Sequence, residues 1–91
     1  MSSIDISHAH SLSPDAARSA IEEVVGKLSE RFGVQSRWEG DVVKFSGSGV
    51  DGAIALQPQQ VRVTAELGFL LSAMKTMVES EIRRVLSEKL S

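Results

Sequence analysis

Residues 34–67 read VQSRWEGDVVKFSGSGVDGAIALQPQQVRVTAEL, and this stretch decides the fold. Apolar and polar residues alternate along most of it, which is the period of strands with one buried face. Turn signals interrupt the alternation at Gly40-Asp41, Ser48-Gly49 and Pro58-Gln59. The pattern therefore predicts four consecutive antiparallel strands joined by tight turns.

The three turns imply one common register. Trp38 is expected opposite Val43, and Val43 opposite Ile54. One face then gathers the apolar side chains Val34, Trp38, Val43, Phe45, Val50, Ile54, Leu56, Val61, Val63 and Leu67. The other face gathers the polar side chains Gln35, Arg37, Glu39, Lys44, Ser46, Asp51, Gln57, Arg62, Thr64 and Glu66. This separation predicts an antiparallel sheet that is buried on one face and wet on the other.

A strand and a helix are predicted before this stretch. Residues 3–9 alternate as well, with two isoleucines on one side, and predict a first strand that pairs beside the last one. A helix start follows at Ser13-Pro14, because the serine side chain can cap and proline has no amide to leave unpaired. Apolar residues at spacings of three and four continue to Phe32, and Gly33 is expected to end the helix.

A long helix is predicted from Leu67 to Ser91, and its apolar side is wider than one core stripe needs. Since only one sheet face is apolar, both helices must cover that face. The predicted fold class is α+β, with two layers in the order β-α-β-β-β-β-α and a five-stranded antiparallel sheet of strand order 1-5-4-3-2. We expect a single domain over residues 1–91, similar in outline to helix-grip folds, in which a curved sheet wraps a long C-terminal helix.

Composition and charge argue against several classes of protein. The chain has no cysteine, a net charge of -2 and a pI near 5.6. An acidic balance argues against nucleic acid as the main partner, because phosphate binding needs a basic surface. No apolar run approaches the roughly 20 residues of a transmembrane helix, and the first residues lack the pattern of a signal peptide. The expected location is the cytoplasm, which suits a chain without disulfides.

Candidates for chemistry are few. His8 and His10 point to the same side of a strand, as metal ligands can, but no third ligand is marked by spacing. Asp51 and Glu66 are adjacent on the wet face in the predicted register. Two such carboxylates could bind a cation or work as acid and base, and a solvated surface is the plainer interpretation. We therefore assign no catalytic residue, no metal and no cofactor, and expect no enzyme; a hydrolase built on these four residues is the least favoured alternative.

The final helix offers the best candidate for a contact site. Two interpretations stay open: a closing helix that is wholly buried, or one that keeps part of its apolar side free for a partner or an acyl chain. Gly52 and Ala65, expected opposite each other, leave room for a ligand or for the bulk of Phe69 or Met74. The candidate contact residues are Phe69, Leu70, Met74, Met77 and Leu90. Of these, Met74, Met77 and Leu90 are the ones expected to stay partly free.

Four short motifs resemble the polyhydroxyalkanoic acid system family. They are SHAHSLSP at residues 7–14, RWEGD at 37–41, SGVDG at 48–52 and ELGFLL at 66–71. The resemblance spans nearly the whole chain. It implies a place among small bacterial proteins associated with polyhydroxyalkanoate storage granules, and it assigns no catalytic residue.

Two hypotheses about function follow. The first is a non-enzymatic accessory protein of the polyhydroxyalkanoate storage system, which contacts a protein partner or the granule surface. The alternative is a small carrier of acyl or hydroxyacyl ligands, with a pocket between the last helix and the sheet. A homodimer is compatible with both, because edge strands are available and Ala53 and Ala55 leave a shallow strip on the open sheet face.

Overall fold

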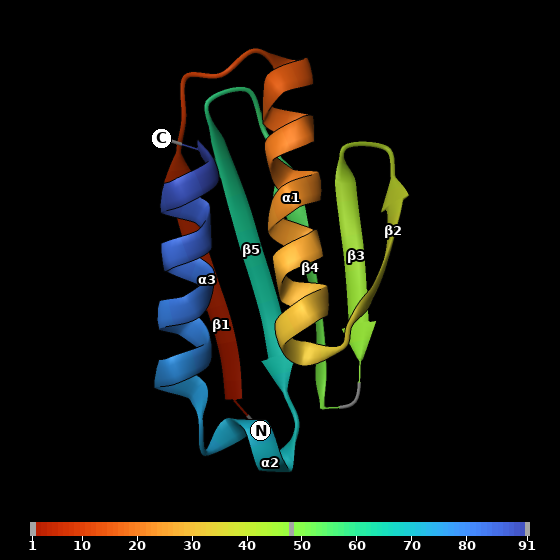
Figure 1. The fold of residues 1–91 in the computed structure, drawn as a ribbon, viewed down its shortest axis with the longest axis vertical. Coiled ribbons are helices and arrows are strands. Elements are labelled where there is room, and N and C mark those ends of the chain that lie inside the picture. The colour runs from red at the N-terminus through yellow and green to blue at the C-terminus, as the bar shows by residue number, and fades with distance from the viewer. Residues whose placement is uncertain (1, 48, 91) are drawn as a thin grey trace.

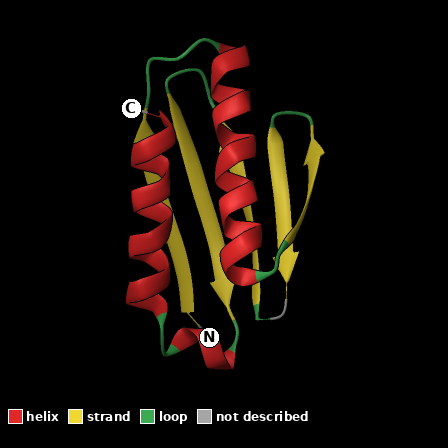
Figure 2. Ribbon diagram, viewed as in Figure 1, coloured by secondary structure: helices red, strands yellow, loops and turns green. Residues whose placement is uncertain are grey.

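A five-stranded antiparallel sheet with helices on one face makes up the described part of the chain, residues 2–47 and 49–90 of a computed structural model (Figure 1 and Figure 2). The elements are β1 (Ser2–Ala9), α1 (Pro14–Phe32), β2 (Gln35–Glu39), β3 (Val42–Gly47), β4 (Val50–Leu56), β5 (Gln60–Leu67), α2 (Phe69–Ser72) and α3 (Lys75–Leu90). The strand order is β1-β5-β4-β3-β2. The predicted α+β class, element order and sheet order are confirmed.

The sheet has the register that the turns predict. Trp38 pairs with Val43, and Val43 pairs with Ile54. β1 runs antiparallel to β5 at the edge of the sheet, as expected. Gly40 has a φ of 65°, which a tight hairpin turn needs at its first central position. Ser48, in the second predicted turn, lies outside the described residues.

Helix α1 begins and ends at the predicted residues. The Ser13 hydroxyl accepts a hydrogen bond from the Ala16 amide at 3.3 Å. At the other end Gly33 is left-handed, with a φ of 67°, and its amide donates to the Ser29 carbonyl at 2.8 Å. α1 packs against α3, and Figure 1 shows both helices on the same face of the sheet. The two layers enclose one core.

The core contains side chains from both helices and from the apolar face of the sheet. Its fully buried members include Ile4, Ile6, Ile21, Val24, Val43, Ile54, Val61, Val63, Val78, Ile82 and Leu86. Trp38 and Leu56, which the pattern places in the core, are half-buried against it. In Figure 1 the β2 side of the sheet extends beyond α1, so fewer side chains cover Trp38.

The C-terminal segment is two helices, and the prediction of one long helix is wrong. The Ser72 amide donates to the Gly68 carbonyl at 2.9 Å and closes a single turn. The Met74 amide then bonds the Leu71 carbonyl at 2.9 Å, and this tighter spacing ends α2. The Met74 carbonyl accepts from Val78 at 2.9 Å and starts α3 in a new direction (Figure 1). The bend lets α2 cross the end of the sheet while α3 runs back over β1, which one straight helix could not do.

Candidate functional site

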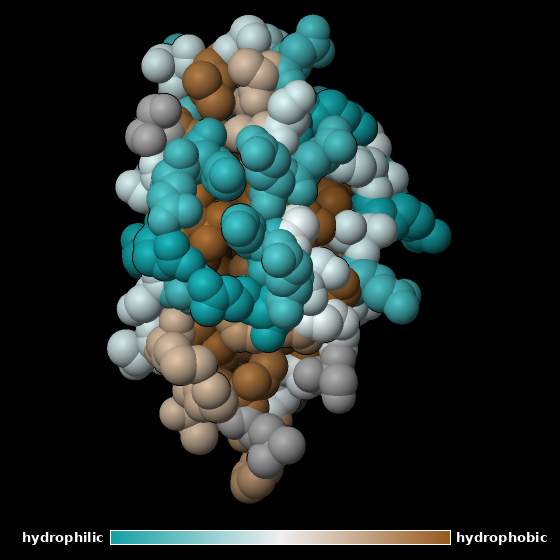
Figure 3. Space-filling model, in the orientation of Figure 1, coloured by the Kyte–Doolittle hydropathy of each residue, from teal (hydrophilic) through white to brown (hydrophobic). Residues whose placement is uncertain are grey.

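An exposed apolar corner lies where α2 meets α3. We use this name for Phe69, Met74 and Met77, whose exposed fractions are 91%, 42% and 53%. They are the large hydrophobic side chains that the described residues leave exposed. In Figure 3, tan and brown atoms gather at the lower end of the molecule, which is where Figure 1 places α2 and the start of α3. Clustered apolar exposure of this kind is typical of a contact surface.

Backbone contacts fix the position of the apolar corner. The Gly68 amide donates to the Gly49 carbonyl at 2.8 Å, which ties the start of α2 to the turn between β3 and β4. The Ser72 hydroxyl donates to the Leu67 carbonyl at 3.2 Å. Leu71 is half-buried and packs against the core. With Leu71 turned inward, Phe69 at the first position of α2 points to solvent.

The structure separates the predicted contact residues. Phe69, Met74 and Met77 are exposed on α2, at the bend and on the first turn of α3, whereas Leu90 is 2% exposed and belongs to the core. The expectation that Leu90 stays partly free is wrong, because Leu90 lies four residues after Leu86 and continues the buried stripe of α3. The side chain of Leu70 lies outside the described residues.

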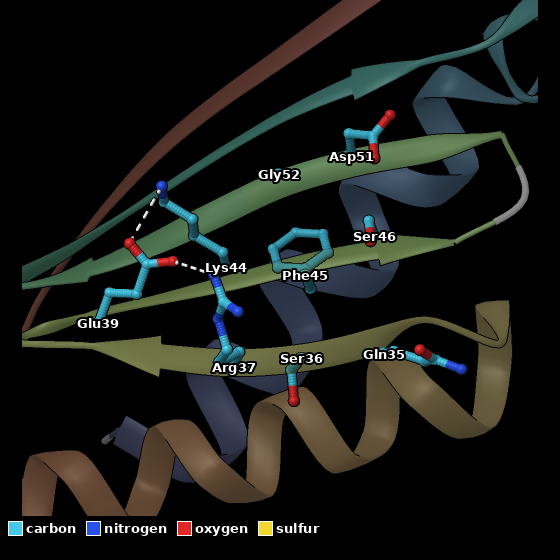
Figure 4. Close-up of a pocket in the computed structure, with 9 residues that line it drawn as sticks. All are labelled: Gln35, Ser36, Arg37, Glu39, Lys44, Phe45, Ser46, Asp51 and Gly52. Carbon is cyan, nitrogen blue, oxygen red and sulfur yellow. Dashed lines mark hydrogen bonds and ion pairs between the residues drawn. The ribbon is translucent and has the colours of Figure 1, made fainter.

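The wet face of the sheet carries the second predicted cluster. Asp51 pairs with Glu66 on β5 and with Ser46 on β3, as the register predicts. A shallow hollow of about 530 Å³ is lined by Asp51 and Ser46 (Figure 4), and Glu66 lines a second one of about 390 Å³ with Asp51. Both carboxylates are exposed. The arrangement is that of a solvated row on an open surface.

An ion-pair cluster occupies the other end of the first hollow. Arg37 Nη2 lies 2.8 Å from Glu39 Oε2, and Lys44 Nζ lies 3.3 Å from Glu39 Oε1 (Figure 4). Hydrogen bonds from Arg37 and then Lys44 hold the pKa of Glu39 below its ordinary value of 4.5. Glu39 is therefore a stable carboxylate, which makes it a poor proton donor near neutral pH.

The histidines lie far from both carboxylates. His8 pairs with Val61, whereas Glu66 pairs with Ser3 at the opposite end of β1. At ~3.3 Å per residue this separation along the strand is about 17 Å. His10 is engaged at both ring nitrogens: Nδ1 accepts from the Leu12 amide at 3.1 Å, and Nε2 lies 3.2 Å from the Gln57 carbonyl. The four residues considered for catalysis do not converge.

The space expected opposite Gly52 is filled by Phe45. The Phe45 ring lies so close to Gly52 that a Cβ built on the glycine would be 2.6 Å from its Cζ, and the two residues are neighbours in Figure 4. Phe45 is buried in the core cluster. The hollows described here lie on the wet face, beside β2 and near His10, and no described residue of α3 lines them. The expectation that Phe69 or Met74 could fill this space is wrong, because both side chains are exposed. Phe45 fills it instead, because its ring reaches over the neighbouring strand.

The fold and the corner define a small two-layer α+β protein with a wet sheet face and an exposed apolar corner. Residues 4–90 match the family described as "putative polyhydroxyalkanoic acid system protein", and the chain belongs to that family. No curated protein and no solved structure matches the chain. Within residues 2–47 and 49–90, no helix combines the length and the apolar character needed to cross a membrane.

Proposed function

We propose that this protein is a non-enzymatic accessory factor of the bacterial polyhydroxyalkanoate storage system, and that it works at the granule surface in the cytoplasm through its apolar corner. The observation that carries the proposal is the exposure of Phe69, Met74 and Met77 on one corner of the fold. Membership of the family supplies the polyhydroxyalkanoate setting. The corner supplies the means of contact.

The shape and charge of the corner favour a surface over a folded partner with a matching pocket. Phe69 is almost fully exposed at the tip of α2, so it can enter an apolar phase with little rearrangement. Methionine side chains are flexible and adapt to an irregular apolar surface. The first turn of α3 contains no acidic residue and begins with Lys75, so no carboxylate of that turn would have to be desolvated.

Binding to granules tests this proposal. The purified protein is mixed with native polyhydroxyalkanoate granules, and the bound fraction is measured by sedimentation. We expect F69S and M77S each to lower the apparent affinity by at least about tenfold, and the double variant to lower it by at least about 100-fold, since each substitution loses roughly 1.5–3 kcal/mol of burial.

The matched control is Gln59→Ser, at the opposite end of the sheet, which should bind like the wild type. Circular dichroism melts show whether each variant is folded; both corner side chains are exposed, so folding should be retained. Equal binding by all variants contradicts the proposal. Binding that needs a granule-bound protein, and disappears on protein-free polymer, shows instead that the corner contacts a protein partner.

The carrier alternative has less support, because Phe45 fills the space that a ligand would occupy. The non-enzymatic role is supported by the wide separation of the histidines from Asp51 and Glu66. A variant with all four residues replaced should leave polymer synthesis and breakdown in the host unchanged. Altered polymer metabolism would favour the enzyme hypothesis.

A further inference from the structure

Strand β2 is an open edge of the sheet. It is the last strand in the order β1-β5-β4-β3-β2, and in Figure 1 no element of the described chain lies beyond it. A groove of about 380 Å³ runs between β2 and α1 and is lined by Glu22, Val25, Gly26, Ser29, Ser36 and Trp38. The helix layer thus stops short of this edge, and a further strand could be added to the sheet here.

The backbone groups available at this edge follow from the register. The Gln57 amide donates to the Gln60 carbonyl at 2.9 Å, so this pair is a hydrogen-bonded one. Hydrogen-bonded and non-bonded pairs alternate along an antiparallel ladder, and each residue bonds to one neighbouring strand only. When this alternation is counted across β4 and β3, Glu39 forms a hydrogen-bonded pair with its partner in β3. The N–H and C=O groups of Ser36 and Trp38 therefore point toward the free edge.

The side chains of β2 are complementary to a second copy of β2. If two β2 strands run antiparallel with Trp38 opposite Trp38 of the second copy, Arg37 lies opposite Glu39, and Glu39 opposite Arg37. This register also places the outward backbone groups of Trp38 opposite each other, as a hydrogen-bonded pair requires. A shift by one pair would place Arg37 opposite Arg37, and like charges directly opposite are unfavourable.

We propose that the protein forms a homodimer through antiparallel pairing of β2 with β2, which joins the two sheets into one continuous sheet with a two-fold axis at Trp38. Arg37 and Glu39 bond each other within one chain, and their side-chain exposures of 80% and 41% leave both accessible for the same pairing with a second copy. Trp38 is half-buried, and the Arg18 guanidinium lies 3.9 Å from its ring centroid. Pairing covers the remaining face of both indoles. It leaves the apolar corner free, so the dimer is independent of the proposed function.

The other edge lacks this complementarity. β1 carries a single charged residue, Asp5, so a second copy of β1 offers no opposite charge to pair with it. In antiparallel self-pairing of β1, Asp5 would face either itself or an uncharged residue. β1 is also covered by α3, whereas the described residues place no helix over the outer side of β2. The charge pattern therefore favours dimerisation through β2 over dimerisation through β1.

Charge-reversal variants and their mixture test the dimer. Sedimentation equilibrium should give the wild type a mass of about twice 9.8 kDa. R37E places two acidic residues on each β2, and E39R places two basic residues there, so each variant alone should dimerise at least about tenfold more weakly. An equimolar mixture of the two variants should form a heterodimer, because the two acidic side chains of one β2 then face the two basic side chains of the other.

The mixture distinguishes charge repulsion at β2 from a simple loss of folding, since a misfolded variant is not rescued by a partner. The matched control is Arg83→Glu on α3, which makes the same change of charge away from β2 and should leave the dimer intact. A wild-type chain that stays monomeric up to about 100 μM would overturn the proposal. A dimer that persists in both variants, or a mixture that gives no heterodimer, would overturn it as well.

Discussion

Gly52 shows how one residue can decide what the interior holds. A Cβ at this position would meet the carbonyl oxygen of Thr64 and would lie 2.6 Å from Phe45 Cζ and 3.0 Å from Ala65 Cα. Two of these three atoms belong to the backbone of β5 and cannot move aside cheaply. The glycine thus lets the aromatic ring approach β4 closely and fill the space that a ligand would need.

Replacing Gly52 by alanine should therefore destabilise the protein by about 1–3 kcal/mol, because the added methyl group overpacks the sheet. Urea unfolding measures the change. The matched control is Gly26→Ala in α1, where a Cβ would find nothing within 4 Å. We expect G26A to stabilise the protein by about 0.4–1 kcal/mol through better helix propensity and a less flexible unfolded chain. A neutral G52A variant would contradict the packing described for Phe45.

At the scale of elements, local sequence signals determine where α1 begins and ends, whereas tertiary packing determines where α2 and α3 begin and end. The Ser13 cap and Gly33 both act through hydrogen bonds within a few residues. The bend at Met74 has no comparable local signal, since neither proline nor glycine lies between Phe69 and Leu90. It arises because Leu71 packs at the end of the sheet while the stripe of α3 must cover β1.

The cap of α1 can be tested with two serine substitutions. Ser13→Ala removes the oxygen that accepts from the Ala16 amide and should destabilise the protein by about 1 kcal/mol. Ser19 lies inside the same helix without a capping role, and S19A should raise stability by a few tenths of a kcal/mol, since alanine has the higher helix propensity. Thermal melts followed by circular dichroism compare the two. Equal effects of the two substitutions would show that the cap contributes nothing.

At the scale of the whole molecule, exposed ion pairs link elements that the chain keeps far apart. Arg62 on β5 bonds Asp5 on β1 in a two-pronged geometry, with distances of 3.0 and 2.5 Å. Glu81 on α3 lies 3.4 Å from Arg31 on α1. Hydrogen bonds from Arg62 lower the pKa of Asp5 below its ordinary value of 3.8, and those from Arg84 lower the pKa of Glu81 below 4.5.

These lowered pKa values predict a loss of stability in acid. The unfolded chain keeps the ordinary pKa values and binds protons first as the pH falls, so protonation favours unfolding. The contribution of these ion pairs to the free energy of unfolding should be complete above about pH 5. It should disappear as the pH falls through the lower native pKa values. Urea midpoints measured between about pH 3 and pH 7 test this. Asp5→Asn and Arg62→Gln should each flatten the curve by a similar amount; an unchanged curve in both would contradict the role of this pair.

The sheet could be predicted almost completely, whereas the candidate contact site could be predicted only in part. Strand register needs only alternation and turn residues, and Val43, Ile54 and Val63 pair as these two signals predict. For the site, periodicity shows that a helix has excess apolar residues but not which of them face solvent. Met77 and Leu90 are equally apolar in the sequence, yet one is exposed and the other is buried.

The sequence by itself determined the family, the α+β class, the strand order and the sidedness of the sheet, because short motifs, turn residues and the alternation of polar with apolar residues are all visible in short stretches of the chain. Only the tertiary structure decided that Phe45 closes the interior over Gly52, that the last helix bends at Met74, and that β2 stays uncovered. Each of these depends on how much space remains once the two layers have packed. Volume at a packed interface depends on many distant residues at once and leaves no local pattern in the chain.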